Sequence, residues 1–141
     1  MAGINEIDKA VQTLLKLGIK VTKLWENASP ASAFKGQEIQ VAAKSNDFVL
    51  IETNYSTTAS TDEVFIIEPE RGGYLRELAG AGYGNVGYSS RYVEFTDTAV
   101  KFGDNYTKTS IGSTANGTVN NTYQIPKQIF GIKLLGGGVL N

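Results

Sequence analysis

The sequence predicts a mainly β protein, an antiparallel β-sandwich of the jelly-roll kind behind one short N-terminal α-helix. From Ile19 onward, hydrophobic residues recur at every second position in short segments, which is typical of strands. The spacers are rich in Ser, Thr, Asn, Asp and Gly, and no helical pattern alternates with the strands. The 41% hydrophobic content of 141 residues suffices for one core. We therefore expect a helix in residues 1–18, a β-sandwich in 19–135 and a Gly-rich tail in 136–141.

The N-terminal segment places Ile4, Ile7, Val11 and Leu14 on one helical face, and Gly18 is expected to end the helix. The four residues also fit the a and d positions of two heptads, where isoleucine favours three helices. Two interpretations stay open: the helix covers its own domain, or it forms the stalk of a homotrimer. Since two heptads bury little apolar area, the trimer would also need contacts between the β domains.

A first strand is expected from Ile19 onward, and further strands are expected at residues 38–42, 48–55, 64–68, 74–78, 91–96, 99–102 and 124–135. In the first strand, Ile19, Val21 and Leu24 are expected to share one side. The unbroken hydrophobic run in 48–51 indicates a central strand with both faces covered.

Three details of the connections also follow from the sequence. Residues 96–98 are expected to turn a hairpin between two strands. Pro126 should bend or break the last strand, because proline cannot donate to a ladder. The segment 105–122 has few hydrophobic residues and is expected to be an exposed loop.

Composition excludes several classes of function. Thirteen Lys and Arg against fourteen Asp and Glu give a formal charge of -1, so no basic surplus favours nucleic acid or an anionic membrane. The chain has no cysteine and no histidine, which removes thiol nucleophiles, the Ser-His-Asp arrangement and the usual zinc ligands. Residues 1–17 lack the pattern of a secretory signal, and no apolar run approaches the ~20 residues of a membrane span. The sequence thus predicts a soluble protein made in the cytoplasm.

Motifs of catalysis are weak. Gly82, Gly84 and Gly87 have the G-x-G-x-x-G spacing, but the residues that follow read as a strand rather than the helix that a dinucleotide site needs. A glycosidase needs two placed carboxylates, and no pair stands out among the candidates, which are Glu63, Glu68, Glu70, Glu77 and Glu94. We therefore expect no enzymatic activity, no cofactor and no metal site.

Tyrosines are the better binding candidates, because rings with a polar tip stack on sugars and anchor interfaces. Tyr83, Tyr88 and Tyr106 lie in or beside Gly-rich or Asn-rich segments, where β scaffolds carry their binding loops. The simpler alternative is that these tyrosines are ordinary sandwich surface and core rim.

Several short motifs occur together, namely Leu24-Trp25-Glu26-Asn27-Ala28-Ser29-Pro30, Asp47-Phe48-Val49-Leu50-Ile51-Glu52, Val93-Glu94-Phe95-Thr96-Asp97, Phe102-Gly103-Asp104 and Ile125-Pro126. In this set, residues 21–134 resemble a small β domain of structural and fibre proteins of tailed phages and prophages of Gram-positive bacteria. The resemblance implies a multimeric virion component in a tail, fibre, baseplate or head accessory. The resemblance implies no active site, because the shared motifs consist of turn residues and core residues.

Two functions are expected on these grounds. The first is a non-enzymatic virion protein that forms a homotrimer through Ile4, Ile7, Val11 and Leu14, contacts other virion proteins and touches the host surface. The alternative is a carbohydrate-binding module that recognises cell-wall glycans through its loop tyrosines.

Overall fold

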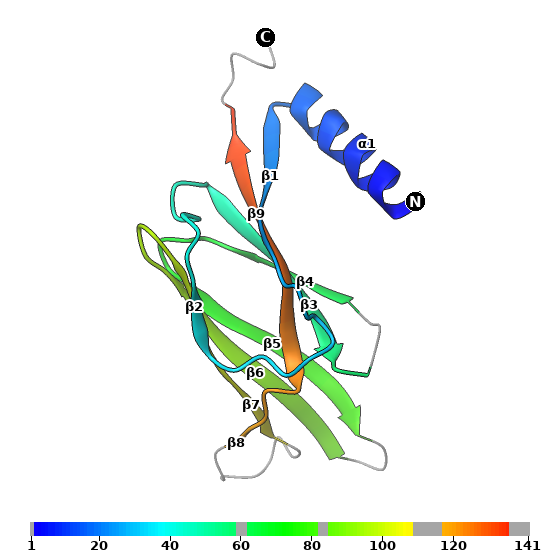
Figure 1. Ribbon diagram of the computed structural model, residues 1–141, viewed down its shortest axis with the longest axis vertical. Helices are drawn as coiled ribbons and strands as arrows, with labels where there is room; N and C mark the ends of the chain where they lie inside the picture. The colour runs from blue at the N-terminus through cyan, green and yellow to red at the C-terminus, as the bar shows by residue number, and fades with distance from the viewer. Residues whose placement is uncertain (1, 59–61, 82–84, 109–116, 136–141) are drawn as a thin grey trace.

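Two antiparallel sheets face each other across a hydrophobic core, and one helix precedes them (Figure 1). The structure is a computed structural model that describes residues 2–58, 62–81, 85–108 and 117–135, with side chains for all of these except 2–5, 7, 78–81 and 85–87. The elements within these ranges are α1 (Ala2–Lys16), β1 (Ile19–Glu26), β2 (Gln37–Ile39), β3 (Phe48–Ser56), β4 (Asp62–Ile67), β5 (Gly73–Ala81), β6 (Asn85–Phe95), β7 (Val100–Lys108), β8 (Thr118–Val119) and β9 (Tyr123–Leu134). The predicted β-sandwich behind one short helix is confirmed.

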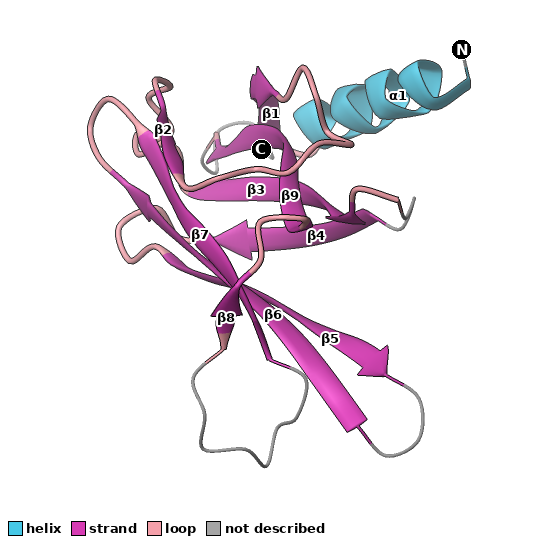
Figure 2. Cartoon of the chain, turned by 60° about the horizontal axis from the view of Figure 1, so that its bottom comes forward, coloured by secondary structure: helices cyan, strands magenta, loops and turns pink. Residues whose placement is uncertain are grey.

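The chain passes repeatedly between the sheets. Sheet A has the strand order β1-β9-β3-β4, and sheet B has the order β2-β7-β6-β5 with β8 paired to β7. All the pairings are antiparallel. Figure 2 shows the strands of the two sheets crossing at an angle, with the β5–β6 hairpin reaching away from the rest of the molecule. Each sheet therefore has one face toward the core and one face turned outward.

The core lies between the inner faces of the sheets. Val49 and Ile51 of β3 meet Leu75 of β5 and Val93 of β6, and all four are fully buried. Phe34, from the β1–β2 connection, closes one side, and its ring lies edge-on to Phe102 with centroids 5.5 Å apart. Edge-on packing of aromatic rings stabilises the core beyond the contribution of the buried hydrophobic area.

The helix ends as the sequence predicts. Gly18 has a φ of 82°, a left-handed conformation that glycine adopts without strain, and its N–H donates to the carbonyl of Leu15. The chain then turns directly into β1, which is the strand that α1 chiefly contacts. The helix axis points away from the sheets (Figure 1), so α1 covers only one edge of sheet A.

The prediction for the first strand is wrong at Leu24. In a strand that alternates regularly, Leu24 faces the side opposite to Val21, and it packs against the core. The bulge between Lys23 and Trp25 brings Trp25 to the core side as well. Ile19 and Val21 lie on the opposite, outward side.

The predicted loop at 105–122 is also wrong in part, because β7 continues to Lys108 and β8 pairs with it. The inward-facing residues of this extension are polar, so the sequence does not show the hydrophobic alternation of a strand there. Asn105 is fully buried there, and its side-chain amide donates to the carbonyl of Asn120 at 2.9 Å. The hairpin at 96–98 is confirmed, since Phe95 pairs with Val100 across it. Pro126 pairs with Thr53, and Gln128 pairs with the preceding residue of β3, Glu52. The register therefore shifts by one residue directly after Pro126, which is a bulge in β9.

Candidate functional site

The outer face of sheet A is hydrophobic, although it does not belong to the core. In β3, Val49 and Ile51 point into the sandwich, so Phe48 and Leu50 point outward. The pairing extends this outward set across the sheet, since Phe48 pairs with Ile132, and Leu50 pairs with both Phe130 and Ile66. We call the whole set the outer apolar face, and its members are Ile19, Val21, Phe48, Leu50, Val64, Ile66, Phe130, Ile132 and Leu134.

Part of this face is open to solvent. Ile66 is 64% exposed, Val64 is 56% exposed and Leu134 is 55% exposed. Single exposed hydrophobic side chains are ordinary, but adjacent ones on four paired strands form a contiguous patch, and such patches mark interaction sites. The outer apolar face is therefore the first candidate for a functional surface.

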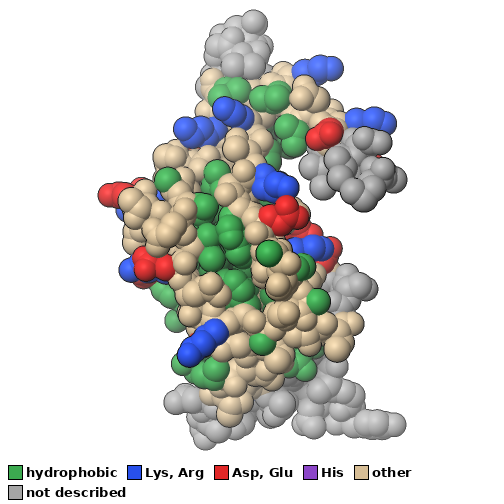
Figure 3. Space-filling model, in the orientation of Figure 1, with side chains coloured by type: hydrophobic (Ala, Val, Ile, Leu, Met, Phe, Trp, Pro, Cys, Tyr) green, Lys and Arg blue, Asp and Glu red, His purple; other side chains and the backbone are tan. Residues whose placement is uncertain are grey.

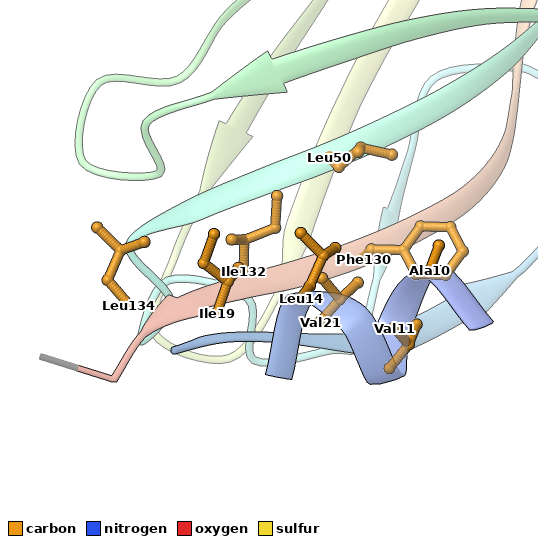
Figure 4. Close-up of a pocket in the computed structure, with 9 residues that line it drawn as sticks. All are labelled: Ala10, Val11, Leu14, Ile19, Val21, Leu50, Phe130, Ile132 and Leu134. Atoms are coloured by element: carbon orange, nitrogen blue, oxygen red, sulfur yellow. The ribbon is translucent and has the colours of Figure 1, made fainter. Parts of the chain in front are cut away.

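The helix forms a groove with this face rather than closing over it. The groove has a volume of about 370 Å³, and its lining is wholly hydrophobic: Ala10, Val11, Leu14, Ile19, Val21, Leu50, Phe130, Ile132 and Leu134. Figure 4 shows Ala10 and Leu14 on the helix side, with Phe130 and Ile132 on the sheet side. Of the four helical residues predicted to form an oligomer interface, Val11 and Leu14 line this groove, whereas the side chains of Ile4 and Ile7 lie outside the described part.

Polar groups border the outer apolar face. Lys127 lies 3.2 Å from a carboxylate oxygen of Asp62 and 3.6 Å from one of Glu52. Burial is the main cause that raises the pKa of Glu52 above its ordinary value. On the β1 side, Glu26 pairs with Lys23 at 3.1 Å. On the face of the molecule seen in Figure 3, hydrophobic side chains reach the surface between charged groups. A hydrophobic centre with a polar rim is the usual anatomy of a protein interface.

Sheet B carries a second candidate surface, made of tyrosines on its outer face. Tyr74 of β5 pairs with Tyr92 of β6, their ring centroids are 5.0 Å apart, and they are 55% and 38% exposed. Tyr106 of β7 is 49% exposed and pairs with Ser90. Tyr88 lies on the same side of β6, two residues before Ser90.

The predicted tyrosine set thus overlaps this surface only in part. Tyr88 and Tyr106 lie on strands rather than in loops, and Tyr83 lies outside the described residues. Tyr74 and Tyr92 also have polar or glycine neighbours in the sequence, but they were not selected as the best exposed candidates. The two-residue spacing of Tyr88, Ser90 and Tyr92 was the available signal, because it puts all three on one face of a strand.

The structure brings together two carboxyl pairs that the sequence did not single out. Glu52 and Asp62 lie close together, both near Lys127. Glu63 of β4 and Glu77 of β5 are the other pair, and they come close together between the two sheets. Burial, followed by the neighbouring charge of Glu63, raises the pKa of Glu77 to about 7.

Replacing Glu77 by glutamine should remove a pH dependence of stability. The raised pKa means that the folded state holds a proton that the unfolded state loses, so stability falls as pH rises from about 4.5 to about 7 and is then constant. After allowance for solvent screening, we expect a loss of about 1 to 2 kcal/mol over this range. Urea unfolding at pH 5 and pH 8 measures it. Glu77→Gln should be more stable than wild type at pH 8 only, and the exposed control Glu70→Gln should be unchanged at both; equal effects at both pH values would contradict this.

The side chain of Asp104 links separate turns of the fold through hydrogen bonds. One carboxylate oxygen of Asp104 accepts hydrogen bonds from the Gly36 N–H at 2.8 Å and the Asn121 amide at 2.9 Å. These bonds lower the pKa of Asp104. Within the described ranges, no three acidic, histidine or cysteine side chains gather as a metal site. No described helix has the length and hydrophobicity to cross a bilayer.

The two surfaces, the outer apolar face with its groove and the tyrosine-bearing face of sheet B, are thus the features best suited to binding. Comparison of the chain with family models, with curated proteins and with solved structures finds no match.

Proposed function

We propose that this protein is a non-enzymatic, self-assembling structural component of a phage virion, located in a tail, fibre, baseplate or head accessory. The observation that carries the proposal is the outer apolar face of sheet A, which α1 covers at one edge only. The sequence resemblance to phage structural domains supplies the biological setting. Its partners are further copies of itself and other virion proteins.

The geometry also supports a specific manner of assembly. A two-heptad helix is too short to hold three chains together, so the β domains have to supply further contact. The outer apolar face lies directly beside the helix and shares the groove with Val11 and Leu14. In the proposed homotrimer, helix and sheet therefore form one continuous interface, with the polar groups at its rim left in water.

Ile66→Asp should break this assembly. Ile66 lies on the outer face of β4, where a carboxylate would be desolvated without a partner in the assembled protein, at a cost of several kcal/mol. Light scattering should give wild type about three times the mass of one 15.2 kDa chain and should give Ile66→Asp the mass of one chain. Val119→Asp is the matched control, because Val119 is 52% exposed on β8 of sheet B and should leave the mass unchanged.

A wild-type mass of 15.2 kDa at all concentrations would contradict the proposed assembly. The virion location has a separate test, immunogold electron microscopy of particles purified from cells that carry the gene. We expect gold on the particles, and label confined to the cytoplasm would contradict a structural role.

A further inference from the structure

Oxygen-bearing side chains from four strands gather between the two sheets, near the edge strands β4 and β5. On sheet A, Glu63 of β4 pairs directly with Thr53 of β3. On sheet B, Glu77 of β5 pairs directly with Ser89 of β6. Residues paired directly across two strands share a face, with their Cβ atoms about 4.5 to 5.5 Å apart. Since Glu63 and Glu77 come close together between the sheets, their paired neighbours point inward beside them. We call these four residues the interior oxygen cluster.

The two hydroxyl groups of the cluster are buried without a partner. Thr53 is fully buried and Ser89 is 1% exposed, yet neither hydroxyl has a hydrogen-bond partner among the described residues. The same holds for one buried carboxylate oxygen of Glu77. Native proteins satisfy nearly all buried polar groups, because an unsatisfied one costs free energy. Three such oxygens on adjoining, inward-facing positions therefore point to a ligand that binds oxygen.

The bases of the surrounding strands do not neutralise the two carboxylates. Among the described residues, no base forms an ion pair with either of them. Arg91 of β6 also points inward, but its guanidinium reaches away from β5, to carbonyls of β7 and β9. Arg76 and Lys108 lie on the outer face of sheet B, and Lys127 lies at the rim of the outer apolar face. Two neighbouring carboxylates repel each other unless a proton or a cation lies between them.

The oxygens of the cluster have the chemistry of a calcium site. Ca²⁺ takes roughly six to eight oxygen ligands from carboxylates, neutral groups and water, at about 2.3 to 2.6 Å. Two carboxylates and two hydroxyls supply most of these. Glu63 and Glu77 are only partly buried, so water reaches the cluster and can complete the coordination. Mg²⁺ suits the cluster less well, because it demands octahedral geometry and gives up its water reluctantly.

We propose that the interior oxygen cluster binds one Ca²⁺ ion, which links sheet A to sheet B. The sequence did not indicate this site, because its residues come from four strands and follow no ligand spacing. The unfolded chain does not hold these residues together, so the ion should stabilise the folded state. The cluster lies inside the sandwich and is separate from the outer apolar face, so the site does not depend on the proposed assembly.

Calcium titration of the full chain tests the site, after treatment with a chelator, at pH 8 and at protein concentrations too low for assembly. Calcium at about one hundred times its dissociation constant should raise the melting temperature by roughly 5 to 10 °C. Isothermal titration with CaCl₂ should give one ion per chain. No heat and no change of melting temperature up to about 10 mM CaCl₂, well above the range of weak protein sites, would overturn the proposal. Equal affinity for MgCl₂ would overturn the assignment to calcium.

Variants locate the ion. Glu77→Gln removes one carboxylate, should be at least as stable as wild type at pH 8, and should lose the calcium-dependent rise in melting temperature. Ser89→Ala removes a neutral ligand and should weaken calcium binding about tenfold. The control is Glu70→Gln, which makes the same charge change on a side chain that is 76% exposed and should bind calcium like wild type. Calcium stabilisation that persists in Glu77→Gln, or that Glu70→Gln loses to the same extent, would overturn the proposal.

Discussion

Replacing Arg91 by leucine should destabilise the protein by about 3 to 5 kcal/mol, because a fully buried guanidinium joins the two sheets. From β6, Arg91 donates to the backbone carbonyl of Gly103 at 2.7 Å and to those of Gln124 and Tyr123 at 3.0 and 3.2 Å. The guanidinium also lies 5.3 Å from the centre of the Phe34 ring. Burial lowers the pKa of Arg91 to about 10, so the group stays charged at neutral pH. Leucine would leave three carbonyls without their donors.

Urea unfolding measures this loss, with Arg91→Lys as the second variant. Lysine keeps the charge but cannot reach three acceptors with a planar fork, so we expect an intermediate loss. The exposed control Arg71→Leu should cost less than about 0.5 kcal/mol. A loss below about 1 kcal/mol for Arg91→Leu would show that these hydrogen bonds do not hold the sheets together.

Ile51→Ala and Leu50→Ala should differ sharply, although the two residues are neighbours on β3. Ile51 is fully buried in the core, and its truncation should cost about 3 to 4 kcal/mol of folding free energy. Leu50 belongs to the outer apolar face, so Leu50→Ala should cost the isolated chain about 1 kcal/mol or less and should instead raise the dissociation constant of the assembly.

Urea denaturation of both variants at protein concentrations too low for assembly measures the loss of folding free energy without a contribution from self-association. The dissociation constant of the assembly comes from sedimentation at higher concentrations. If Leu50→Ala destabilises the isolated chain as much as Ile51→Ala, then the outer face of β3 is part of the folding core rather than an interface.

The sequence predicted the class of fold and most strand positions, because alternation on one-sided strands is a direct physical signal. It also identified residues 48–51 as a strand with two hydrophobic faces. It did not predict that α1 covers only part of the outer hydrophobic face of this strand. The angle between α1 and the sheet depends on packing between residues that are distant in the sequence. Leu24 was misassigned because the prediction grouped it with Val21, three residues earlier, whereas the side chains of a strand alternate and place Leu24 on the core side.

The polar interior escaped prediction altogether. Arg91 and Asn105 are buried opposite each other on β6 and β7. Hydrophobic residues are expected at such inward positions of a strand, so two polar residues there gave no sign of their burial. The Glu63–Glu77 pair joins strands of different sheets, so neither sequence spacing nor strand alternation connects the two residues. Of the binding tyrosines, only Tyr106 was both predicted and found exposed, because the exposure of Tyr74 and Tyr92 depends on which face of sheet B meets the core.

The central claim is that copies of this protein meet through the outer apolar face of sheet A, and cysteine labelling tests it most directly. The chain has no cysteine, so a single introduced thiol reports on one position. The rate of maleimide labelling is measured for Ile66→Cys and for Val119→Cys as the protein concentration rises. We predict that labelling at position 66 slows as copies assemble over it, while labelling at position 119 on sheet B keeps its rate. Labelling at position 66 that is independent of concentration, or protection at position 119 alone, would contradict the claim.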